Sequence, residues 1–178
     1  ILGELLWTLW PGPVDRWDDS SVVRIKLFGG ALSSATKEQV LNGANVFAIQ
    51  ASDEWEIVQA RQCVLVAPGE YELAGLLRGR LGSAHAMASA HPVGARIVAL
   101  DKNLGRIAIG AHEWGEALDF AAPPAGHPST HDRATRLTVT LPHAAARPWA
   151  PAHLRARRDA TGDVAVSWVR CARIGGDS

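Results

Sequence analysis

The amino-acid sequence predicts a mainly β fold, in which antiparallel sheets form a barrel or a sandwich, with one or two short helices. Three observations support this prediction. Short runs of residues alternate between apolar and polar side chains, as in half-buried strands. Clusters of Gly, Pro, Asn and Asp separate these runs, as turns do. The stretches that carry helix signals are short.

The predicted strands of the first 141 residues mostly form hairpins. In residues 22–28, Arg24 and Lys26 alternate with apolar residues, so we expect these two side chains on the wet face of a strand. Short loops, such as Pro68-Gly69-Glu70, join several of the other runs as hairpin turns do. These other strands are predicted at residues 46–50, 55–60, 63–67, 71–74, 96–100, 106–109, 117–121 and 135–141.

Two short helices are predicted between these strands. In residues 33–42, Thr36 and Gln39 have the spacing of a capping box, and Gly43 stands where a helix C-terminal cap belongs. The second helix is predicted at residues 83–90, where Ser83 can cap an alanine-rich stretch. The β-rich domain is therefore expected to occupy residues 1–141.

The C-terminal part has a different organisation. Residues 142–151 are rich in Pro, Ala, His and Arg without periodicity, and we interpret them as a linker. Two further strands are predicted at residues 153–158 and 164–170. Two strands cannot form an independent sandwich, so residues 152–178 are either the start of a truncated domain or a hairpin docked on the main body.

Charge and composition argue against nucleic-acid and membrane partners. Basic and acidic residues number 18 each, so no net field attracts nucleic acid or anionic lipid. No apolar run approaches the ~20 residues of a transmembrane helix, and the first residues lack the pattern of a signal peptide. Six arginines crowd into the C-terminal part, and we interpret them as solvated strand faces rather than a phosphate-binding patch: Arg147, Arg155, Arg157, Arg158, Arg170 and Arg173.

The seven tryptophans raise the question of sugar binding. Trp55 and Trp168 lie inside alternating runs, so we predict structural roles for them in the core or in an interface. Trp114 stands among Glu113, Gly115 and Glu116 in a predicted loop, and it is the candidate ligand-binding residue. A carbohydrate-binding module therefore remains an alternative to a purely structural segment.

No motif predicts catalysis, a metal site or a cofactor. His85 and His91 are six residues apart, which does not place two ligands on one helical face. A site from His127, His131 and Asp132 can be drawn in one loop, but solvated histidines are the preferred interpretation. The paired carboxylates are all expected in turns, and Glu113 with Glu116 would be the acids of a weaker, enzymatic alternative: Asp18, Asp19, Asp53, Glu54, Glu113 and Glu116.

Two cysteines and one glycine-rich stretch are interpreted structurally. Cys63 and Cys171 lie far apart, so we expect no disulfide and two small buried or half-buried side chains. Residues 78–82 are too short for a phosphate loop. There we predict a structural bend at Gly79, with Arg78 bonded to a carboxylate or to backbone carbonyls.

Several stretches resemble a known family. Residues 55–59 and 66–80 contain Trp-Glu-Ile-Val-Gln and Tyr-Glu-Leu-Ala-Gly-Leu-Leu-Arg-Gly, which resemble a stretch of phage tail-tip proteins. Residues 148–158, 163–168 and 173–178 look like the C-terminal part of the baseplate "megatron" of gene transfer agents. Residues 151 onward also resemble the first strands of a fibronectin type III domain, with Trp168 as its core aromatic and the remaining strands absent.

This resemblance implies an architectural role without catalysis. The expected protein is a component of a phage-like tail baseplate or tip, which is assembled in the cytoplasm, released with the particle and brought into contact with the host envelope. The expected partners are other baseplate proteins, neighbouring domains of the same chain and identical subunits, with a homotrimer suggested. A host surface glycan is the partner in the alternative interpretation.

Overall fold

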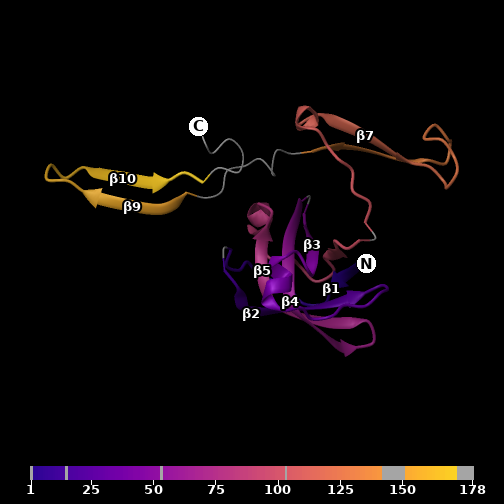
Figure 1. Cartoon of the computed structure of the whole chain (residues 1–178), viewed down its shortest axis with the longest axis horizontal. Coiled ribbons are helices and arrows are strands. Elements are labelled where there is room, and N and C mark those ends of the chain that lie inside the picture. Colours follow the sequence, from indigo (N-terminus) through magenta and orange to yellow (C-terminus); the bar gives the residue numbers. More distant parts are fainter. Residues whose placement is uncertain (1, 15, 53, 103, 142–150, 172–178) are drawn as a thin grey trace. The chain divides into compact units, whose positions relative to one another are not determined.

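A computed structural model of the chain describes residues 2–14, 16–52, 54–102, 104–141 and 151–171. The chain divides into two compact units, Ile1–Arg106 and Ile107–Ser178. The first unit contains a barrel, and the second contains two separate two-stranded sheets (Figure 1). The predicted mainly β fold is confirmed, and the barrel is the architecture observed in the first unit.

Six antiparallel strands close the barrel. Their order around it is β1-β2-β5-β4-β3-β6, and β6 pairs again with β1. Closure pairs the strands on both sides and removes the free edges that an open sheet would expose. The strands are β1 (Leu2–Leu5), β2 (Asp18–Leu27), β3 (Val46–Ala51), β4 (Glu54–Ala67), β5 (Glu70–Arg80) and β6 (Arg96–Ala99).

Alternation along the strands builds the barrel core. In β2, Val23, Ile25 and Leu27 are buried, while Arg24 and Lys26 are partly exposed on the other face, as predicted. The same two-residue period brings side chains of the other five strands into one apolar cluster. Its largest fully buried apolar members are Phe47, Leu5, Leu9, Ile25, Ile49, Leu73, Leu76 and Ile97.

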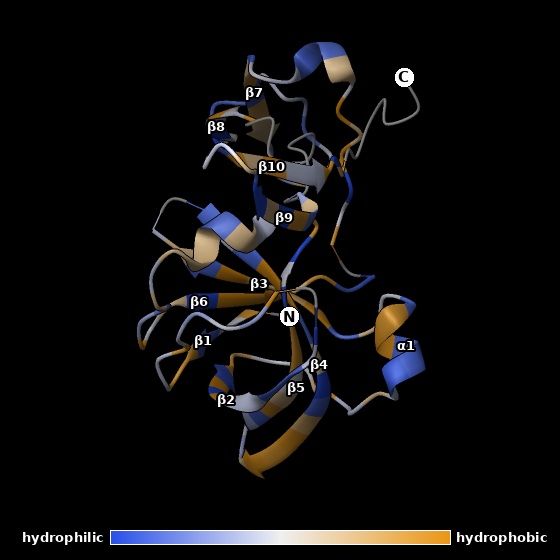
Figure 2. Cartoon of the chain, turned by 90° about the vertical axis from the view of Figure 1, so that its left-hand side faces the viewer, coloured by the Kyte–Doolittle hydropathy of each residue, from blue (hydrophilic) through white to orange (hydrophobic). Residues whose placement is uncertain are grey.

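Strand β4 is longer than the sequence predicts. The strands expected at residues 55–60 and 63–67 are one continuous strand, because Arg61 and Gln62 carry no turn signal and both hairpins share it. The end of β4 leaves Val64, Leu65 and Val66 exposed. This end of the β4–β5 hairpin is orange in the hydropathy colouring of Figure 2.

The first predicted helix is confirmed as α1, Lys37–Leu41. Thr36 and Gln39 form the predicted capping box, with the Gln39 amide donating to Thr36 Oγ1 at 3.2 Å. The second is a 3₁₀ helix, η1 (Ser83–Met87), rather than an α-helix. Ser83 does not cap it, because its hydroxyl is used elsewhere: it donates to the Arg80 carbonyl and accepts from the Ile57 amide.

The predicted hairpin of residues 96–100 and 106–109 is wrong. No strand is found at residues 106–109. Instead β6 pairs with β1 on one side and with β3 on the other, which closes the barrel. Because β6 already has a partner strand on each side, it cannot also pair with residues 106–109 in the local hairpin that the turn residues 101–105 suggest.

The described part of the second unit contains two two-stranded ribbons. A 3₁₀ helix, η2 (Ala111–Glu113), precedes β7 (Ala117–Ala122), which pairs with β8 (Thr135–Thr140). The predicted C-terminal strands are observed as β9 (Ala152–Arg158) and β10 (Val164–Val169). Residues 142–150, which hold nearly all of the predicted linker and Trp149, lie outside the described residues, so the domain limits at 141 and 152 remain predictions.

Two general expectations can be compared with the fold. In the described part of the chain, no helix has the length and apolar character needed to cross a bilayer. Both cysteines are free, Cys63 buried and Cys171 partly exposed, as predicted. Burial raises the pKa of the Cys63 thiol to about 12, so this thiol stays protonated at neutral pH.

Candidate functional site

Four ionisable side chains are buried at one end of the barrel. Asp18 begins β2, Glu56 lies near the start of β4, Arg78 lies near the end of β5, and His91 lies between η1 and β6. Their exposed fractions are 1%, 0%, 2% and 1%. The register pairs Ile57 with Arg80, which brings the start of β4 beside the end of β5. We refer to these four residues as the polar cluster.

Glu56 is the centre of the polar cluster. Its Oε1 accepts hydrogen bonds from Arg78 Nε at 2.7 Å and from the Gly79 amide at 3.0 Å. Its Oε2 accepts from Arg78 Nη2 at 2.8 Å and lies 2.6 Å from His91 Nε2. The two parallel bonds from Arg78 give the pair a fixed geometry as well as a strong charge-assisted interaction.

The cluster also holds residues 6–14, which we call the covering segment. Arg78 Nη1 donates to the Trp10 carbonyl at 3.0 Å. Leu9 and His91 exchange two backbone hydrogen bonds, of 3.0 and 2.9 Å. A Cβ at Gly12 would lie 2.7 Å from Asp18 Oδ2, so glycine lets this backbone approach the cluster closely. The covering segment is therefore fixed to the barrel end by hydrogen bonds to Arg78 and to His91.

Asp18 is bonded through one of its two oxygens. Its Oδ1 accepts from the Ser20 hydroxyl at 2.8 Å and from the amides of Ser20 and Ser21 at 3.2 and 3.0 Å. Its buried Oδ2 has no hydrogen-bond partner, and Arg78 Nη1 lies 3.9 Å away. The attraction between Asp18 and Arg78 is thus mainly one of charge.

Both carboxyl groups are held in the ionised form. Burial by itself raises the pKa of Glu56, but hydrogen bonds from Arg78 and His91, the charge of Arg78 and the Gly79 amide outweigh it, so the pKa is lowered. For Asp18, burial also raises the pKa, and hydrogen bonds from Ser21 and Ser20 outweigh it. The cluster therefore contains two buried negative charges at neutral pH.

This arrangement serves to hold structure together. Each of the four side chains is almost completely shielded from solvent. Removing one member of a buried ion pair leaves a buried charge without compensation, which is strongly destabilising. The cluster thus couples β2, β4, β5, the covering segment and the connection before β6.

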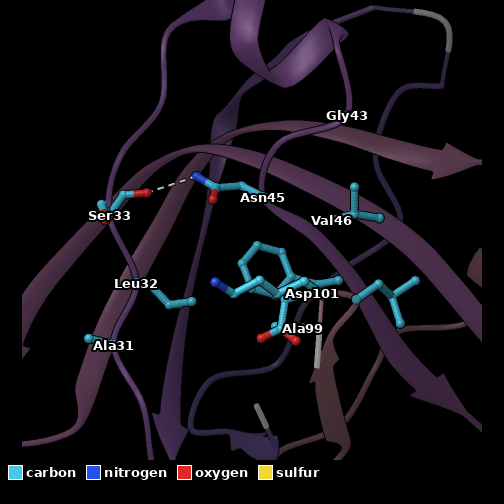
Figure 3. A pocket seen from close by; sticks show the side chains of 11 residues that line it. Ala31, Leu32, Ser33, Gly43, Asn45, Val46, Ala99 and Asp101 are labelled. Atoms are coloured by element: carbon cyan, nitrogen blue, oxygen red, sulfur yellow. Dashed lines mark hydrogen bonds between the residues drawn. The ribbon is translucent and has the colours of Figure 1, made fainter. Parts of the chain in front are cut away.

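A pocket lies beside the first residues of β3. The polar cluster, in contrast, lies beside the last residues of this strand. The pocket has a volume of about 380 Å³. Its walls are mainly small or apolar, and the Asn45 side chain donates to the Ser33 carbonyl at 2.9 Å across one side (Figure 3). The lining residues are Ala31, Leu32, Ser33, Gly43, Asn45, Val46, Phe47, Ala99, Leu100, Asp101 and Lys102.

The tryptophans predicted as core residues are not in a core. Trp55 is 40% exposed and Trp168 is 57% exposed, so this part of the prediction is wrong, while the alternative of an interface stays a prediction. Trp55 points outward because the alternation along β4 places Glu56 on the inner face. Trp114, the candidate ligand-binding residue, lies in the turn that follows η2, as predicted, but is half-buried rather than exposed.

The glycine-rich stretch lies directly at the polar cluster. Arg78 bonds both a carboxylate, that of Glu56, and a backbone carbonyl, that of Trp10. Gly79 has φ +58°, and a Cβ there would lie 2.9 Å from Ala84. This position therefore requires glycine for both its backbone conformation and its packing.

The three loop residues His127, His131 and Asp132 do lie close together. The rings of His127 and His131 have centroids 4.3 Å apart, and His131 Nδ1 lies 3.0 Å from Asp132 Oδ1, although the Asp132 side chain is 87% exposed. Within the described ranges, no group of three His, Cys, Asp or Glu side chains could hold a metal ion. The prediction that all paired carboxylates lie in turns is wrong for four of them: Asp18 and Asp19 are in β2, Glu54 is in β4, and Glu113 is in η2. Asp53 lies outside the described residues.

Sequence reasoning missed Glu56 and His91 as partners of Arg78. For Glu56 a signal existed, because it shares the inward period of β4 with the buried residues Val58 and Ala60. An acid at such a position calls for a buried cation. For His91 no comparable signal existed, since its burial depends on the Leu9 pairing, which joins residues 82 positions apart in the sequence.

The fold and the polar cluster define a small closed β-barrel whose one end is fastened by buried ion pairs. The family model described as "Rcc01698-like, C-terminal" matches residues 1–98. Because this is more than half of the 178 residues, the chain belongs to that family. The matched region coincides with the barrel strands, which run from Leu2 to Ala99. No curated protein matches the chain.

Proposed function

We propose that this chain is a structural, non-enzymatic component of a phage-like tail baseplate or tip, similar to the gene transfer agent megatron. Its family membership supports this proposal, and so does the resemblance of residues 55–80 to the tail-tip stretch. The Glu, Arg and Gly of that stretch are Glu56, Arg78 and Gly79, which meet in the buried contacts at the barrel end. A motif used to hold the fold favours an architectural role over a reactive one.

The observation that carries the proposal is the exposed apolar surface of the second unit. In the β9–β10 ribbon, Val164, Val166 and Trp168 are each more than half exposed. An isolated two-stranded ribbon is marginally stable in water. Such a ribbon is suited to pack against neighbouring domains of the chain, other baseplate proteins or identical subunits, for which the resemblance suggests a trimer.

Location in the particle is the first test. An epitope tag can be inserted at Gly126, where a Cβ would meet nothing within 4 Å. In the cell that makes the particles, we expect gold-labelled antibody to mark the tail tip of purified particles. Label on the head alone, or particles that lack the tagged chain, would contradict the proposal.

A matched pair of double substitutions tests the apolar face. Val164 and Val166 lie on one face of the ribbon, and Ala165 and Ser167 lie on the other. We expect Val164→Lys with Val166→Lys to reduce particle assembly, because it places two charges in a contact surface. Ala165→Lys with Ser167→Lys adds the same charge to the opposite face and should leave assembly near normal. Equal effects of the two pairs would argue against a contact at this face.

Carbohydrate binding is the second candidate function. It is favoured by the exposure of Trp10, which is 69% exposed, because exposed indole faces can stack on sugar rings. In this case the chain would attach the particle to host surface glycans, with Trp114 as a further candidate contact. We would then expect retention in glycan affinity electrophoresis, reduced by Trp10→Ala or Trp114→Ala. Migration unchanged by any envelope glycan would exclude this candidate.

The non-enzymatic part of the proposal has its own test. The Glu113 carboxylate accepts a hydrogen bond from the Gly110 amide at 2.7 Å, which gives it a structural use at the start of η2. We expect no hydrolysis of peptidoglycan by the purified chain. Activity that is lost in Glu113→Gln and Glu116→Gln variants would show that the segment is an enzyme.

A further inference from the structure

We propose that His91 is a buried, proton-dependent latch: as the imidazolium its ring ties the covering segment to the barrel end, and loss of one ring proton loosens that tie. This inference concerns the barrel alone and does not depend on the proposed role in a tail.

The ring geometry indicates that both nitrogens carry a proton. His91 Nε2 lies 2.6 Å from Glu56 Oε2, and Nδ1 lies 3.1 Å from the Gln50 carbonyl oxygen. A carboxylate and a carbonyl can only accept hydrogen bonds, so each nitrogen must donate. A neutral imidazole has one N–H and would turn a lone pair toward one of these oxygens. The ring is 1% exposed, so water does not replace the lost partner.

The charges of the cluster lead to the same assignment. Besides His91, the charged groups of the polar cluster are Glu56 on β4, Arg78 on β5 and Asp18 on β2, and of these three only Glu56 is bonded to the His91 ring, whose other nitrogen faces the Gln50 carbonyl. With a protonated ring, two buried anions face two buried cations. With a neutral ring, one buried negative charge is left without compensation, which is costly away from water.

The backbone of His91 connects this proton to the covering segment. Leu9 is 2% exposed in the barrel core, and its amide and carbonyl both bond to His91. The next residue, Trp10, carries an indole that is 69% exposed, and Trp7 is 42% exposed. A movement of His91 should therefore change the surroundings of Trp7 and Trp10, whose indole N–H groups can be followed by NMR.

The test begins with the unmodified protein, so it does not depend on whether a variant folds. Nitrogen-15 NMR of the histidine rings at neutral pH should show both ring nitrogens of His91 protonated. As the pH is raised until the ring loses a proton, the indole signals of Trp7 and Trp10 should shift at the same midpoint. Hydrogen exchange of the Leu9 amide should then exceed the increase expected from base catalysis alone.

Two histidine variants complete the test. His85 is the matched control, because it lies on η1 and pairs at 3.2 Å with Glu54 at a partly exposed position. We expect His85→Gln to retain the tryptophan transition and His91→Gln to abolish it. A His91 ring with one protonated nitrogen at neutral pH would overturn the proposal. So would tryptophan signals that do not follow the ring, or a transition that survives in His91→Gln.

Discussion

At the scale of single residues, the contacts of Glu56 explain how buried charge is stabilised at the barrel end. A carboxylate removed from water is unfavourable unless hydrogen bonds and an opposite charge compensate for it. Glu56 receives both, from Arg78, His91 and the Gly79 amide. Sequence analysis gave Arg78 a carboxylate or carbonyl partner but could not name it, because Glu56 and Arg78 meet only through the pairing of β4 with β5.

Replacing Glu56 tests this compensation. Glu56→Gln should lower the free energy of unfolding at neutral pH by about 3–5 kcal/mol, because Arg78 loses its buried counter-charge. Urea denaturation followed by circular dichroism measures this loss. Arg96→Gln is the control, since Arg96 is exposed on β6 and should change stability by less than about 0.5 kcal/mol.

The acid dependence of the same variant gives a second readout. The pKa of Glu56 is lower in the folded state than its ordinary value of 4.5, so the unfolded state binds the proton first as the pH falls. The stabilisation from Glu56 is thus complete above that ordinary value and is lost as the pH falls through the folded-state pKa. Glu56→Gln should flatten this acid limb of the stability profile. An acid limb as steep as that of the unmodified protein would show that Glu56 does not contribute to it.

Gly79 gives a prediction that depends on backbone conformation. At φ +58° an alanine is strained, and its Cβ would lie 2.9 Å from Ala84. We expect Gly79→Ala to cost about 1–3 kcal/mol of unfolding free energy, measured by thermal or urea denaturation. Gly29→Ala is the control, because a Cβ there meets nothing within 4 Å and no positive φ is involved. Equal stability of the two variants would contradict this explanation.

At the scale of elements, patterns confined to one segment were predictable and long-range pairings were not. The alternation of β2 and the capping box of α1 can be read from a few adjacent residues, and both are observed. The hairpin predicted at residues 96–109 failed because β6 finds its partners in β1 and β3. Barrel closure joins the first and last strands of the unit, and local turn residues carry no information about that contact.

The cap of α1 gives the prediction at this scale. A helix of five residues has little intrinsic stability, so we expect the capping box to matter. Thr36→Ala removes the Oγ1 acceptor of the Gln39 amide and should cost about 1 kcal/mol of unfolding free energy. Leu41→Ala is the control on the same helix, because Leu41 is 61% exposed. Identical denaturation midpoints for Thr36→Ala and the unmodified protein would show that packing of Val40 alone holds the helix.

At the scale of the whole molecule, the two units differ in what stabilises them. The first has a closed barrel, an apolar core and the polar cluster, all formed by its own residues. The described part of the second has two ribbons, and most of the large apolar side chains of β9 and β10 are exposed. Alternation predicted strands in both units, although it missed β1 of the first. It could not show which strands share a core, because a two-residue period defines faces without defining what covers them.

This difference predicts that the barrel folds alone. Residues 1–106 should give a folded protein with dispersed NMR amide signals and a cooperative thermal transition, because about 100 residues with one closed core suffice for an independent domain. The hydrogen bonds of Glu56 should persist in it, so Glu56→Gln should destabilise this shorter chain as much as the full chain. Residues 107–178 alone should lack a cooperative transition, since two-stranded ribbons without a shared core do not unfold in one step. A shorter chain of residues 1–106 that remains unfolded would mean that the barrel needs the second unit, and that its own core and polar cluster do not suffice.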